Sequence, residues 1–325
     1  MKENNFKAFV IETKLKKGIK LINKDFLKNG DVFVKISYSS FNYKDGLAIS
    51  GKMPIVKEFP MIPGVDFTGE VLESSHKKYK VGDKVILNGW GVGEKHFGGF
   101  SKFARVKGNW LIHLPKKISP KQSMIIGSAG YTAALCVMEL IKKIKPTDGD
   151  ILITGASGGV GSIAVHLLSQ LNYNVIVISG KKSDFLSKIG AKKIIDRNKF
   201  LINEKPLNKQ KWAGCIDTLG GDILSMILSE MKYNGVVAST GLARSHILNT
   251  TVFPFILRNI TLTGIDCVYT DYKKRVKAWN FLEKNLDLKK LNLIFSEKSL
   301  KDLVNLSKAI IKGKVKGRVI INLNL

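Results

Sequence analysis

A glycine-rich segment near the middle of the chain constrains the fold more than any other feature. Residues 154–161 read Thr-Gly-Ala-Ser-Gly-Gly-Val-Gly. They complete a short apolar, strand-like run, Ile151 to Thr154, and precede a run with helical spacing from Ser162 to Leu171. The segment therefore predicts a tight turn that joins a strand directly to a helix.

Strand-like and helix-like runs alternate on both sides of this turn. A helical stretch from Tyr131 to Lys145, closed by Pro146, precedes it, and a helix from Asp184 to Ile189 follows it. The further strand-like runs are Asn174–Ser179, Lys193–Ile195, Ala213–Asp217, Val236–Ser239 and Ile260–Thr263. Strands separated by helices need crossover connections, so this region predicts an α/β fold with a doubly wound parallel sheet.

The N-terminal part of the chain has a different pattern of residues. Short β-like runs separated by Gly, Pro and Asp predict a barrel-like or sandwich-like domain there. These runs are Asp31–Tyr38, Phe67–Leu72, Lys84–Leu87 and Phe100–Lys107. The C-terminal residues resemble this β-rich part again, with a helix from Leu300 to Lys312 and a strand from Arg318 to Leu323. Because 325 residues are enough for two cores, we expect two domains.

Composition and charge narrow the class of protein. The N-terminus lacks the apolar segment of a secretory signal, and no window approaches a membrane-spanning apolar run. The three cysteines, Cys136, Cys215 and Cys267, form no C-x-x-C pair. We therefore expect a cytoplasmic protein with buried thiols, no structural zinc knuckle and no membrane partner.

The net charge of +27 permits a nucleic acid, an anionic membrane surface or a phosphate-rich ligand as a partner. The lysines are scattered along the whole chain and form no basic arm. We therefore interpret the charge as a lysine-rich surface, and no nucleic-acid partner is predicted.

With Ala156, Gly158 and Gly161 at its key positions, the glycine-rich turn matches the A-x-G-x-x-G form of the dinucleotide-binding fingerprint. One small residue serves the tight turn, one lets the backbone approach a pyrophosphate, and one lets the helix pack closely on the strand. The pyrophosphate is expected at the helix N-terminus, where unpaired N–H groups and the helix dipole favour an anion.

The same letters contain a rival motif, because residues 155–159 also satisfy the G-x-S-x-G nucleophile elbow of serine hydrolases. An elbow needs an acid and then a histidine further along the chain. Only His166 and His246 follow Ser157, and His166 lies within the helix after the turn. The elbow also leaves Gly161 unexplained, so the dinucleotide fingerprint is favoured.

The end of the second strand distinguishes between the two nicotinamide cofactors. An enzyme that binds NAD(H) usually has Asp or Glu there for the ribose 2′-hydroxyl, whereas a 2′-phosphate needs cations and hydroxyl donors. The chain has Ser179, Lys181 and Lys182 at this place. NADP(H) is therefore the predicted cofactor, and an ordinary solvated lysine turn is the alternative.

Four further segments carry a family resemblance: residues 39–45 (SSFNYKD), 60–69 (PMIPGVDFTG), 127–133 (GSAGYTA) and 253–259 (FPFILRN). Together with Lys314–Arg318 they resemble the acryloyl-CoA reductase branch of the quinone-oxidoreductase-like enzymes, in the medium-chain dehydrogenase/reductase superfamily. The resemblance implies a GroES-like β-rich catalytic domain, residues 1–125 and 266–325, and a Rossmann NADP-binding domain, residues 126–265.

Zinc-dependent members of that superfamily place a cysteine where this chain has Asn42 and a His-Glu pair where it has Val65 and Asp66. Without thiolate and imidazole ligands, no metal site is expected. The reaction then proceeds without a Lewis-acid metal. This points away from alcohol oxidation and towards reduction of an activated C=C bond.

The resemblance also implies the site residues. The predicted catalytic residues are Asn42 and Tyr43, which can donate hydrogen bonds, and Asp66, which orients a neighbour. Alternatively, Asn42 caps a short helix, Tyr43 packs against the nicotinamide and Asp66 forms a turn. The predicted NADP(H) contacts are Tyr43, Thr132, Ala156, Ser157, Gly158, Gly159, Val160, Gly161, Ser179, Gly180, Lys181, Arg197, Leu242, Ile256 and Cys267.

Two of these positions depart from the branch, which commonly has arginine at Lys181 and often serine at Cys267. Lysine keeps the charge but loses bidentate phosphate geometry, so the selectivity for NADPH is expected to be less sharp.

The implied reaction is hydride transfer from NADPH to the β-carbon of acryloyl-CoA, with protonation at the α-carbon to give propionyl-CoA. Coenzyme A carries several phosphate groups, so a second interpretation of the positive charge is that the lysines attract this substrate. The rivals are an NADPH:quinone or free-enone reductase and, outside the enzymes, a nucleic-acid-binding protein that has kept a reductase fold. The implied assembly is a homodimer paired through the Ile260–Thr263 strand.

Overall fold

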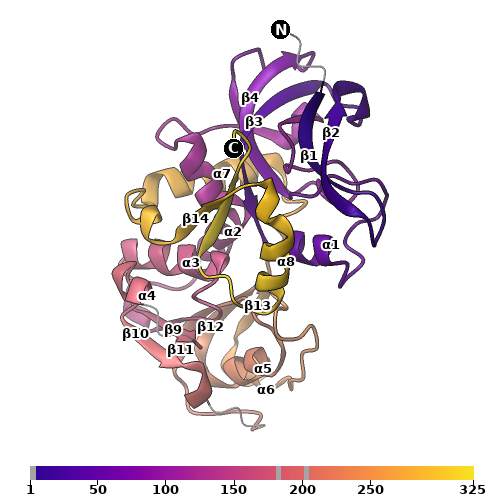
Figure 1. Cartoon of the computed structure of the whole chain (residues 1–325). Helices are drawn as coiled ribbons and strands as arrows, with labels where there is room; N and C mark the ends of the chain where they lie inside the picture. Colours follow the sequence, from indigo (N-terminus) through magenta and orange to yellow (C-terminus); the bar gives the residue numbers. More distant parts are fainter. Residues whose placement is uncertain (1–4, 181–183, 201–204) are drawn as a thin grey trace. The chain divides into compact units, whose positions relative to one another are not determined.

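The computed structural model describes residues 5–180, 184–200 and 205–325. The chain divides into two compact units. The first contains Met1–Ser128, Cys267–Lys277 and Phe295–Leu325, and the second contains Ala129–Asp266 and Ala278–Ile294. Figure 1 shows their elements with labels.

The first unit is built on a seven-stranded sheet with the order β14–β15–β3–β4–β5–β7, in which β6 also pairs with β3. All of these pairs are antiparallel except β14 with β15. The strands are β3 (Val32–Phe41), β4 (Asp66–Ser74), β5 (Lys84–Asn88), β6 (Phe103–Val106), β7 (Leu111–His113), β14 (Phe295–Lys298) and β15 (Arg318–Asn322).

The first residues of strand β3 are buried on both of its faces, whereas Lys35 further along the strand is exposed. Val32, Val34 and Ile36 point to one side, as the two-residue period of a strand requires, and join the main core of this unit. Phe33 points to the other side and joins a second core cluster with residues of the hairpin formed by β1 (Asn5–Ile11) and β2 (Lys17–Asn23). This hairpin was not predicted from the sequence.

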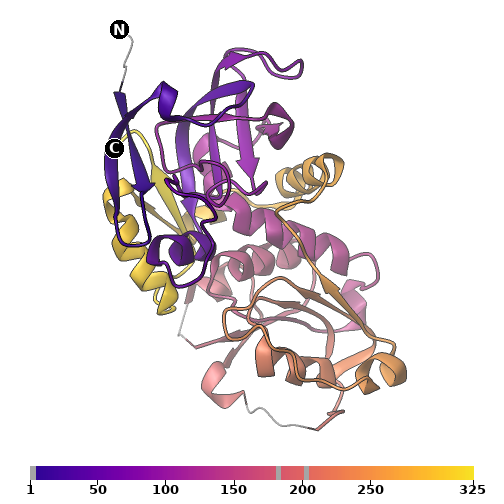
Figure 2. The same cartoon turned by 90° about the vertical axis from the view of Figure 1, so that its right-hand side faces the viewer.

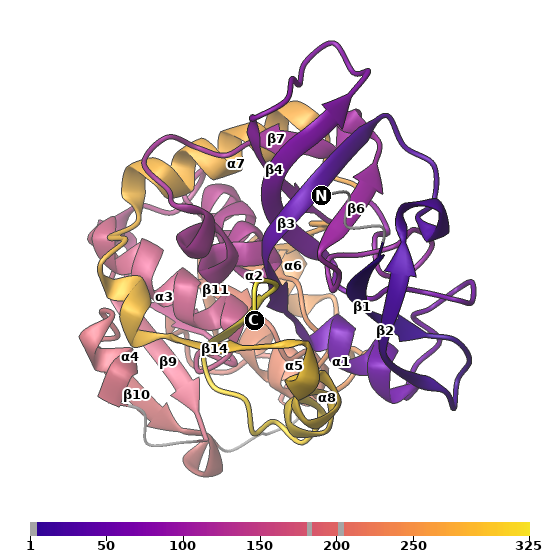
Figure 3. The same cartoon turned by 45° about the horizontal axis from the view of Figure 1, so that its top comes forward.

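Two helices of the first unit lie side by side in Figure 3, α1 (Tyr43–Ser50) and α8 (Leu303–Ile311). They approach closely at Gly46, where an added Cβ would collide with the Ile310 side chain. α1 starts directly after β3 and stops at Gly51, which has a left-handed φ of 72°. The first turn of α1 is therefore held against the end of the central strand.

The second unit contains six parallel strands in the order β10–β9–β8–β11–β12–β13. They are β8 (Ile151–Ile153), β9 (Val175–Ser179), β10 (Lys193–Asp196), β11 (Trp212–Asp217), β12 (Met231–Ser239) and β13 (Thr261–Gly264). The helices between them are α3 (Gly159–Gln170), α4 (Asp184–Lys188), α5 (Gly221–Glu230) and α6 (Phe253–Arg258). Figure 2 gives a second view of this arrangement. The predicted doubly wound sheet is confirmed.

Helix α2 (Pro120–Leu140) differs from its prediction. It begins before Tyr131, ends before Lys145, and is interrupted at Gly127, which has a φ of 53°. By length and composition α2 could cross a membrane, so the expectation that no window would qualify is wrong. However, 83% of that apolar window is buried inside the protein, as in a core helix.

Helix α7 (Tyr272–Asn285) and the residues after it also differ from the predicted division of the chain. The prediction assigned all of 266–325 to the β-rich domain, whereas Ala278–Ile294 belongs to the second compact unit. One contact that holds it there is a hydrogen bond between His166 Nε2 and the carbonyl oxygen of Asp287, at 3.1 Å.

The described residues also form short 3₁₀ helices, which are η1 (Lys24–Phe26), η2 (Gly108–Trp110), η3 (Pro146–Asp148), η4 (Arg197–Lys199), η5 (Lys290–Leu293) and η6 (Leu300–Asp302).

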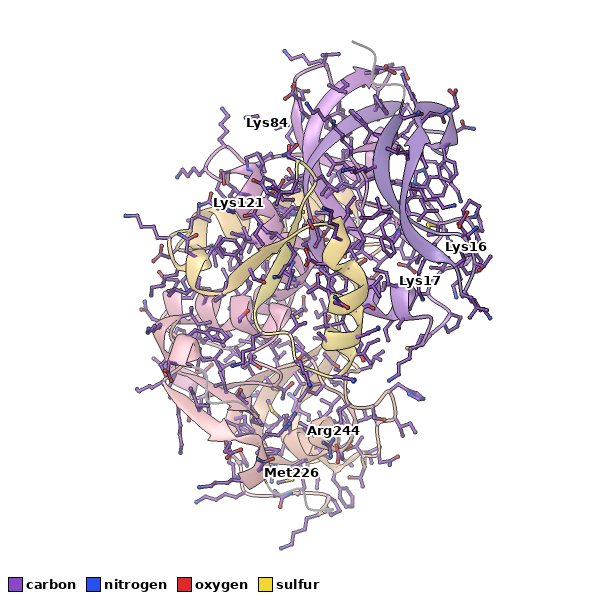
Figure 4. All side chains as sticks on the ribbon, in the orientation of Figure 1. Lys16, Lys17, Lys84, Lys121, Met226 and Arg244 are labelled. Atoms are coloured by element: carbon purple, nitrogen blue, oxygen red, sulfur yellow. The ribbon has the colours of Figure 1, made fainter. Side chains whose placement is uncertain are left out.

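Basic side chains occur on many elements, as Figure 4 shows for its labelled residues. Lys17 starts β2, Lys84 starts β5, and Lys121 is near the start of α2. Lys121 pairs with Glu297 at 2.6 Å, and Arg244 pairs with Asp222. This scatter agrees with the interpretation of the charge as a lysine-rich surface.

Candidate active site

The glycine-rich turn of the second unit follows β8 and leads into α3. Gly155 has a φ of 58°, and an added Cβ would collide with Thr218 Oγ1. The backbone N–H of Gly158 donates to the carbonyl oxygen of Gly155 at 2.9 Å, and α3 starts at the next residue. The glycine that the tight turn requires is therefore Gly155, and not the Ala156 position to which the fingerprint assigned it.

The last glycine of the turn allows close packing. A Cβ on Gly161 would lie 2.6 Å from both Ala156 Cα and Gly155 O, which are backbone atoms. Ala156 itself is fully buried. The helix can therefore approach the turn only because residue 161 has no side chain. The turn residues Ser157, Gly158, Gly159 and Val160 are half-buried.

The geometry does not support the alternative interpretation of this turn as the nucleophile elbow of a serine hydrolase. Ser157 makes no hydrogen bond to a histidine within the described ranges. The His166 ring faces the backbone carbonyl oxygens of Ile189 and Asp287, and His246 is exposed.

A buried polar cluster that the sequence analysis missed supports the turn. Thr154 Oγ1 donates to Asp217 Oδ1 at 2.7 Å, and Thr218 N donates to Thr154 Oγ1 at 2.9 Å. Thr218 Oγ1 also donates to the Thr154 carbonyl oxygen at 3.0 Å. These bonds join the ends of β8 and β11, the neighbouring strands at which the order of the sheet reverses. In open α/β sheets, ligands bind at this place.

Burial raises the pKa of the Asp217 carboxyl, and the hydrogen bonds from Thr154 and from the Gly220 backbone N–H act in the opposite direction. The sequence signal that could have indicated this cluster is Asp217 followed by Thr218 at the end of an apolar strand.

Three predicted NADP(H) contacts lie together at the end of β9. Ser179 is the last residue of the strand, and Gly180 follows it. A Cβ on Gly180 would lie 2.8 Å from Arg197 Cζ, so the guanidinium rests directly against the glycine. Because β8 and β9 are adjacent and parallel, this group and the glycine-rich turn lie at the same edge of the sheet.

An acid also lies close to this group. Asp196 is paired with Ser179 in the register of β10 and β9, and its carboxylate accepts a 2.9 Å hydrogen bond from the Asn198 backbone N–H. Lys181 lies outside the described residues. Among the described residues, this edge therefore shows the Ser179 hydroxyl, the Arg197 guanidinium and the Asp196 carboxylate.

The other predicted cofactor contacts are scattered over the two units. In the second unit, Thr132 is buried on α2, whereas Leu242 and Ile256 are 48% and 68% exposed. In the first unit, Tyr43 is 37% exposed and Cys267 is half-buried. The roles of these five residues stay predictions.

In the first unit, Asp66 lies at the centre of a buried hydrogen-bond network. Its carboxylate accepts from the Ser40 backbone N–H at 2.9 Å, from Ser40 Oγ at 2.7 Å, and from the Ser128 backbone N–H at 2.7 Å. Asp66 is fully buried. This geometry fits a residue that orients its neighbours, and Gly127 leaves the space for it, since an added Cβ there would collide with Ser40 Oγ.

Asn42 precedes the first residue of α1 and is held at both its backbone and its side chain. Its backbone N–H donates to Asp45 Oδ2 at 2.8 Å, the reciprocal bond of a helix cap. Its amide nitrogen faces Ser40 Oγ at 3.1 Å and Asp66 Oδ2 at 3.3 Å. The amide N–H groups therefore point at protein oxygens, and donation to a substrate carbonyl stays a prediction.

Two charged residues of this network were absent from the predicted site. Asp45 accepts from the Val65 backbone N–H at 3.1 Å, and its burial, helped by the nearby Asp66, raises its pKa to about 7. Arg318 donates from Nε to the Ile125 carbonyl oxygen at 2.7 Å and from Nη1 to Asn42 Oδ1 at 3.2 Å. Burial lowers the pKa of Arg318, while the carboxylates of Asp66 and Asp45 act in the opposite direction.

Asn42 and Val65 occupy positions at which the zinc-dependent members of the superfamily that the sequence resembles have metal ligands. Within the described ranges, no group of three or more His, Cys, Asp or Glu side chains is placed to hold a metal ion.

Comparisons with known proteins agree with this geometry. Residues 28–116 match the family model of the alcohol dehydrogenase GroES-like domain, and residues 159–284 match that of the zinc-binding dehydrogenases. The chain is 45% identical to the probable acrylyl-CoA reductase AcuI of Escherichia coli, over 94% of this chain and 95% of that protein. It is 42% identical to the acrylyl-CoA reductase AcuI of Ruegeria pomeroyi, over 98% and 99%.

A solved structure extends the similarity to three dimensions. The YhdH oxidoreductase of Salmonella enterica, solved in complex with NADP, superimposes with a TM-score of 0.95 at 45% identity, over 97% of this chain and 99% of that one. The GroES-like and Rossmann assignments are confirmed. The chain therefore belongs to the medium-chain dehydrogenase/reductase superfamily, within the quinone-oxidoreductase-like branch that includes the acryloyl-CoA reductases.

Proposed function

We propose that the protein reduces the C=C bond of acryloyl-CoA, or of another short enoyl-CoA, with NADPH as the hydride donor. The observation that carries the proposal is the similarity over nearly the whole chain to two bacterial acrylyl-CoA reductases, at 42% and 45% identity. The second unit supports the cofactor, because no side chain caps the start of α3 at Gly158, where an anion can bind the first N–H groups of the helix, and because β9 ends in Ser179.

The residues of the second unit fit NADPH. The turn from Gly155 to Gly161 receives the pyrophosphate, and Ser179 with Arg197 receives the 2′-phosphate through a hydroxyl and a guanidinium. Lys181 is proposed as the second cation of this site. Bound NADPH supplies a hydride to the β-carbon of the substrate.

The residues of the first unit are proposed to assist the second half of the reaction. Saturation of the C=C bond takes up one hydride and one proton, and negative charge develops on the thioester oxygen in between. Tyr43 has a partly exposed phenol at the first position of α1, so it can donate a hydrogen bond to that oxygen or a proton to the α-carbon. Asn42 and Asp66 hold the start of this helix.

A comparison of acceptors tests the function. NADPH oxidation is followed at 340 nm with acryloyl-CoA, with a benzoquinone and without an acceptor. The proposal expects fast turnover only with the CoA thioester, and propionyl-CoA as its product. Turnover with the quinone alone contradicts it and supports the quinone reductase.

Tyr43→Phe tests the role of the phenol. We expect kcat with acryloyl-CoA to fall by about 10²-fold, a typical effect of losing a positioned proton donor, with an unchanged Kd for NADPH. Undiminished turnover with intact NADPH binding contradicts the donor role.

We further propose a cytoplasmic homodimer. β13 is an edge strand of the parallel sheet, so its outer backbone groups can pair with the same strand of a second copy. The supply of NADPH inside the cell, together with two buried free cysteines, supports the location. Light scattering after size-exclusion chromatography is expected to give twice the 36.0 kDa of the chain, and a mass of one chain contradicts the dimer. Cell fractionation tests the location.

A further inference from the structure

We propose that Arg318 is a positioning residue of the reductase, and that its guanidinium fixes the orientation of the Asn42 side chain above the buried carboxylate of Asp66. The inference rests on the proposed reductase activity. It adds a residue that the sequence analysis did not place in the site.

Arg318 cannot act by touching the substrate, because it is only 2% exposed. It lies at the first position of β15, and its contacts are within the first unit. Nε is bound to the Ile125 carbonyl oxygen at 2.7 Å, which leaves Nη1 directed at Asn42 Oδ1 at 3.2 Å. Asn42 is the predicted site residue to which Arg318 donates a hydrogen bond, so the proposed effect on the reaction passes through Asn42.

The charges around Asn42 permit only one orientation of its amide. Arg318 is a pure donor and faces the amide oxygen, whereas the Asp66 carboxylate is a pure acceptor when ionised and faces the amide nitrogen at 3.3 Å. A rotated amide would bring N–H groups against the guanidinium and the oxygen against the carboxylate. Removing the arginine removes the donor that holds the amide oxygen, and leaves the Ser40 carbonyl oxygen and Asp66 as the acceptors that face the amide nitrogen.

Stability alone is a weak explanation for this arginine. Burying a guanidinium costs several kcal/mol in solvation, and a buried ion pair often contributes little net stability. Among the described residues, Nη2 has no hydrogen-bond partner. An added Cβ on Gly127 would collide with Nη2, so the interruption of α2 also leaves space for the guanidinium.

A fixed Asn42 matters for the reaction because of the residue that follows it. Its backbone N–H is bound by Asp45, and Tyr43 is the first residue of α1. Loss of the Arg318 contact therefore releases the amide oxygen of Asn42 at the point where the chain enters the helix, while the amide nitrogen keeps its contacts with Ser40 and Asp66. Displacements of about 1 Å at a reacting centre cost up to about 10²-fold in rate.

The first test is a double-mutant cycle of Arg318→Lys and Asn42→Ala. Arg318→Lys keeps the charge that Asp66 needs, so the variant is expected to fold, but a lysine lacks the forked donors that reach both Ile125 and Asn42. In the wild-type background we expect kcat with acryloyl-CoA to fall by about 10- to 100-fold, with the KM for NADPH changed less than about twofold. In the Asn42→Ala background the same substitution should have almost no effect on kcat. An equal loss in both backgrounds overturns the proposal.

The second test does not depend on turnover. In protein labelled with ¹⁵N-asparagine, the side-chain amide signals of Asn42 are identified by their absence in Asn42→Ala. We expect these signals to shift or broaden in Arg318→Lys, and unchanged signals overturn the proposal. Arg105→Lys is the matched control, because Arg105 forms an ion pair with Glu73 at 3.5 Å on the surface of the same unit. A wild type without turnover on any acceptor refutes the proposed function, while the amide signals still decide the role of Arg318.

Discussion

Replacing Gly161 by alanine tests the proposal that the glycine-rich turn binds the pyrophosphate of NADPH. The new methyl carbon would lie 2.6 Å from Ala156 Cα and Gly155 O, whereas comfortable contacts between carbon atoms are about 3.5 to 4.0 Å. Both neighbours are backbone atoms, so the turn itself has to move by about 1 Å. Overpacking of this kind costs about 1–3 kcal/mol of folding free energy. The same movement turns the N–H groups of the turn away from the proposed position of the pyrophosphate.

We therefore expect Gly161→Ala to lower the Tm and to weaken NADPH binding by about tenfold or more, since a tenfold change in Kd corresponds to about 1.4 kcal/mol. The Kd is measured by titrating NADPH fluorescence, and the Tm without ligand. Gly18→Ala is the control, because nothing lies within 4 Å of an added Cβ there, and both values should stay unchanged. A Gly161→Ala protein that binds NADPH as tightly as the wild type refutes the reasoning.

Two further substitutions test charged groups. Arg197→Gln is expected to raise the KM for NADPH by about tenfold and to leave that for NADH nearly unchanged, because a charge-assisted hydrogen bond to the 2′-phosphate is lost; equal effects on both cofactors contradict this. For Asp45, burial raises the pKa from 3.8 to about 7 in the folded protein, so the native state binds more protons and folding becomes less favourable as the pH rises from about 4 to 7. Between pH 5 and pH 7.5 this costs the wild type about 2 to 3 kcal/mol, and urea unfolding of Asp45→Asn should lack that part of the decline.

The parallel sheet could be predicted from the sequence because its central strands β8, β9 and β11 are short, apolar and buried on both faces. The predicted runs for β8, β9 and β11 agree with the structure to within about one residue. The hairpin of β1 and β2 was missed, since its second strand has only one buried residue, Ile22, and so carries no clear alternation.

In the candidate site, contacts within one segment of the chain could be predicted from the sequence, whereas contacts between distant residues could not. The turn from Gly155 to Gly161 is a continuous segment, so its role could be predicted from neighbouring letters. Arg318 reaches Asn42 across 276 positions of the chain, and no pattern in a single sequence connects the two. The available signal was an arginine at the start of an otherwise apolar strand, which needs a buried partner.

These distant contacts change what the predictions for Asn42 and Tyr43 mean. Asn42 is held by the carboxylates of Asp45 and Asp66 and by the guanidinium of Arg318, so the contacts that cap the helix also fix the side chain that is proposed to assist the reaction. Because Tyr43 is the first residue of that helix, its position depends on the whole network, while its chemistry depends on its own hydroxyl. The two kinds of variant should therefore fail differently: Tyr43→Phe loses the donor from an intact site, whereas Arg318→Lys keeps the donor and loses the geometry that aims it.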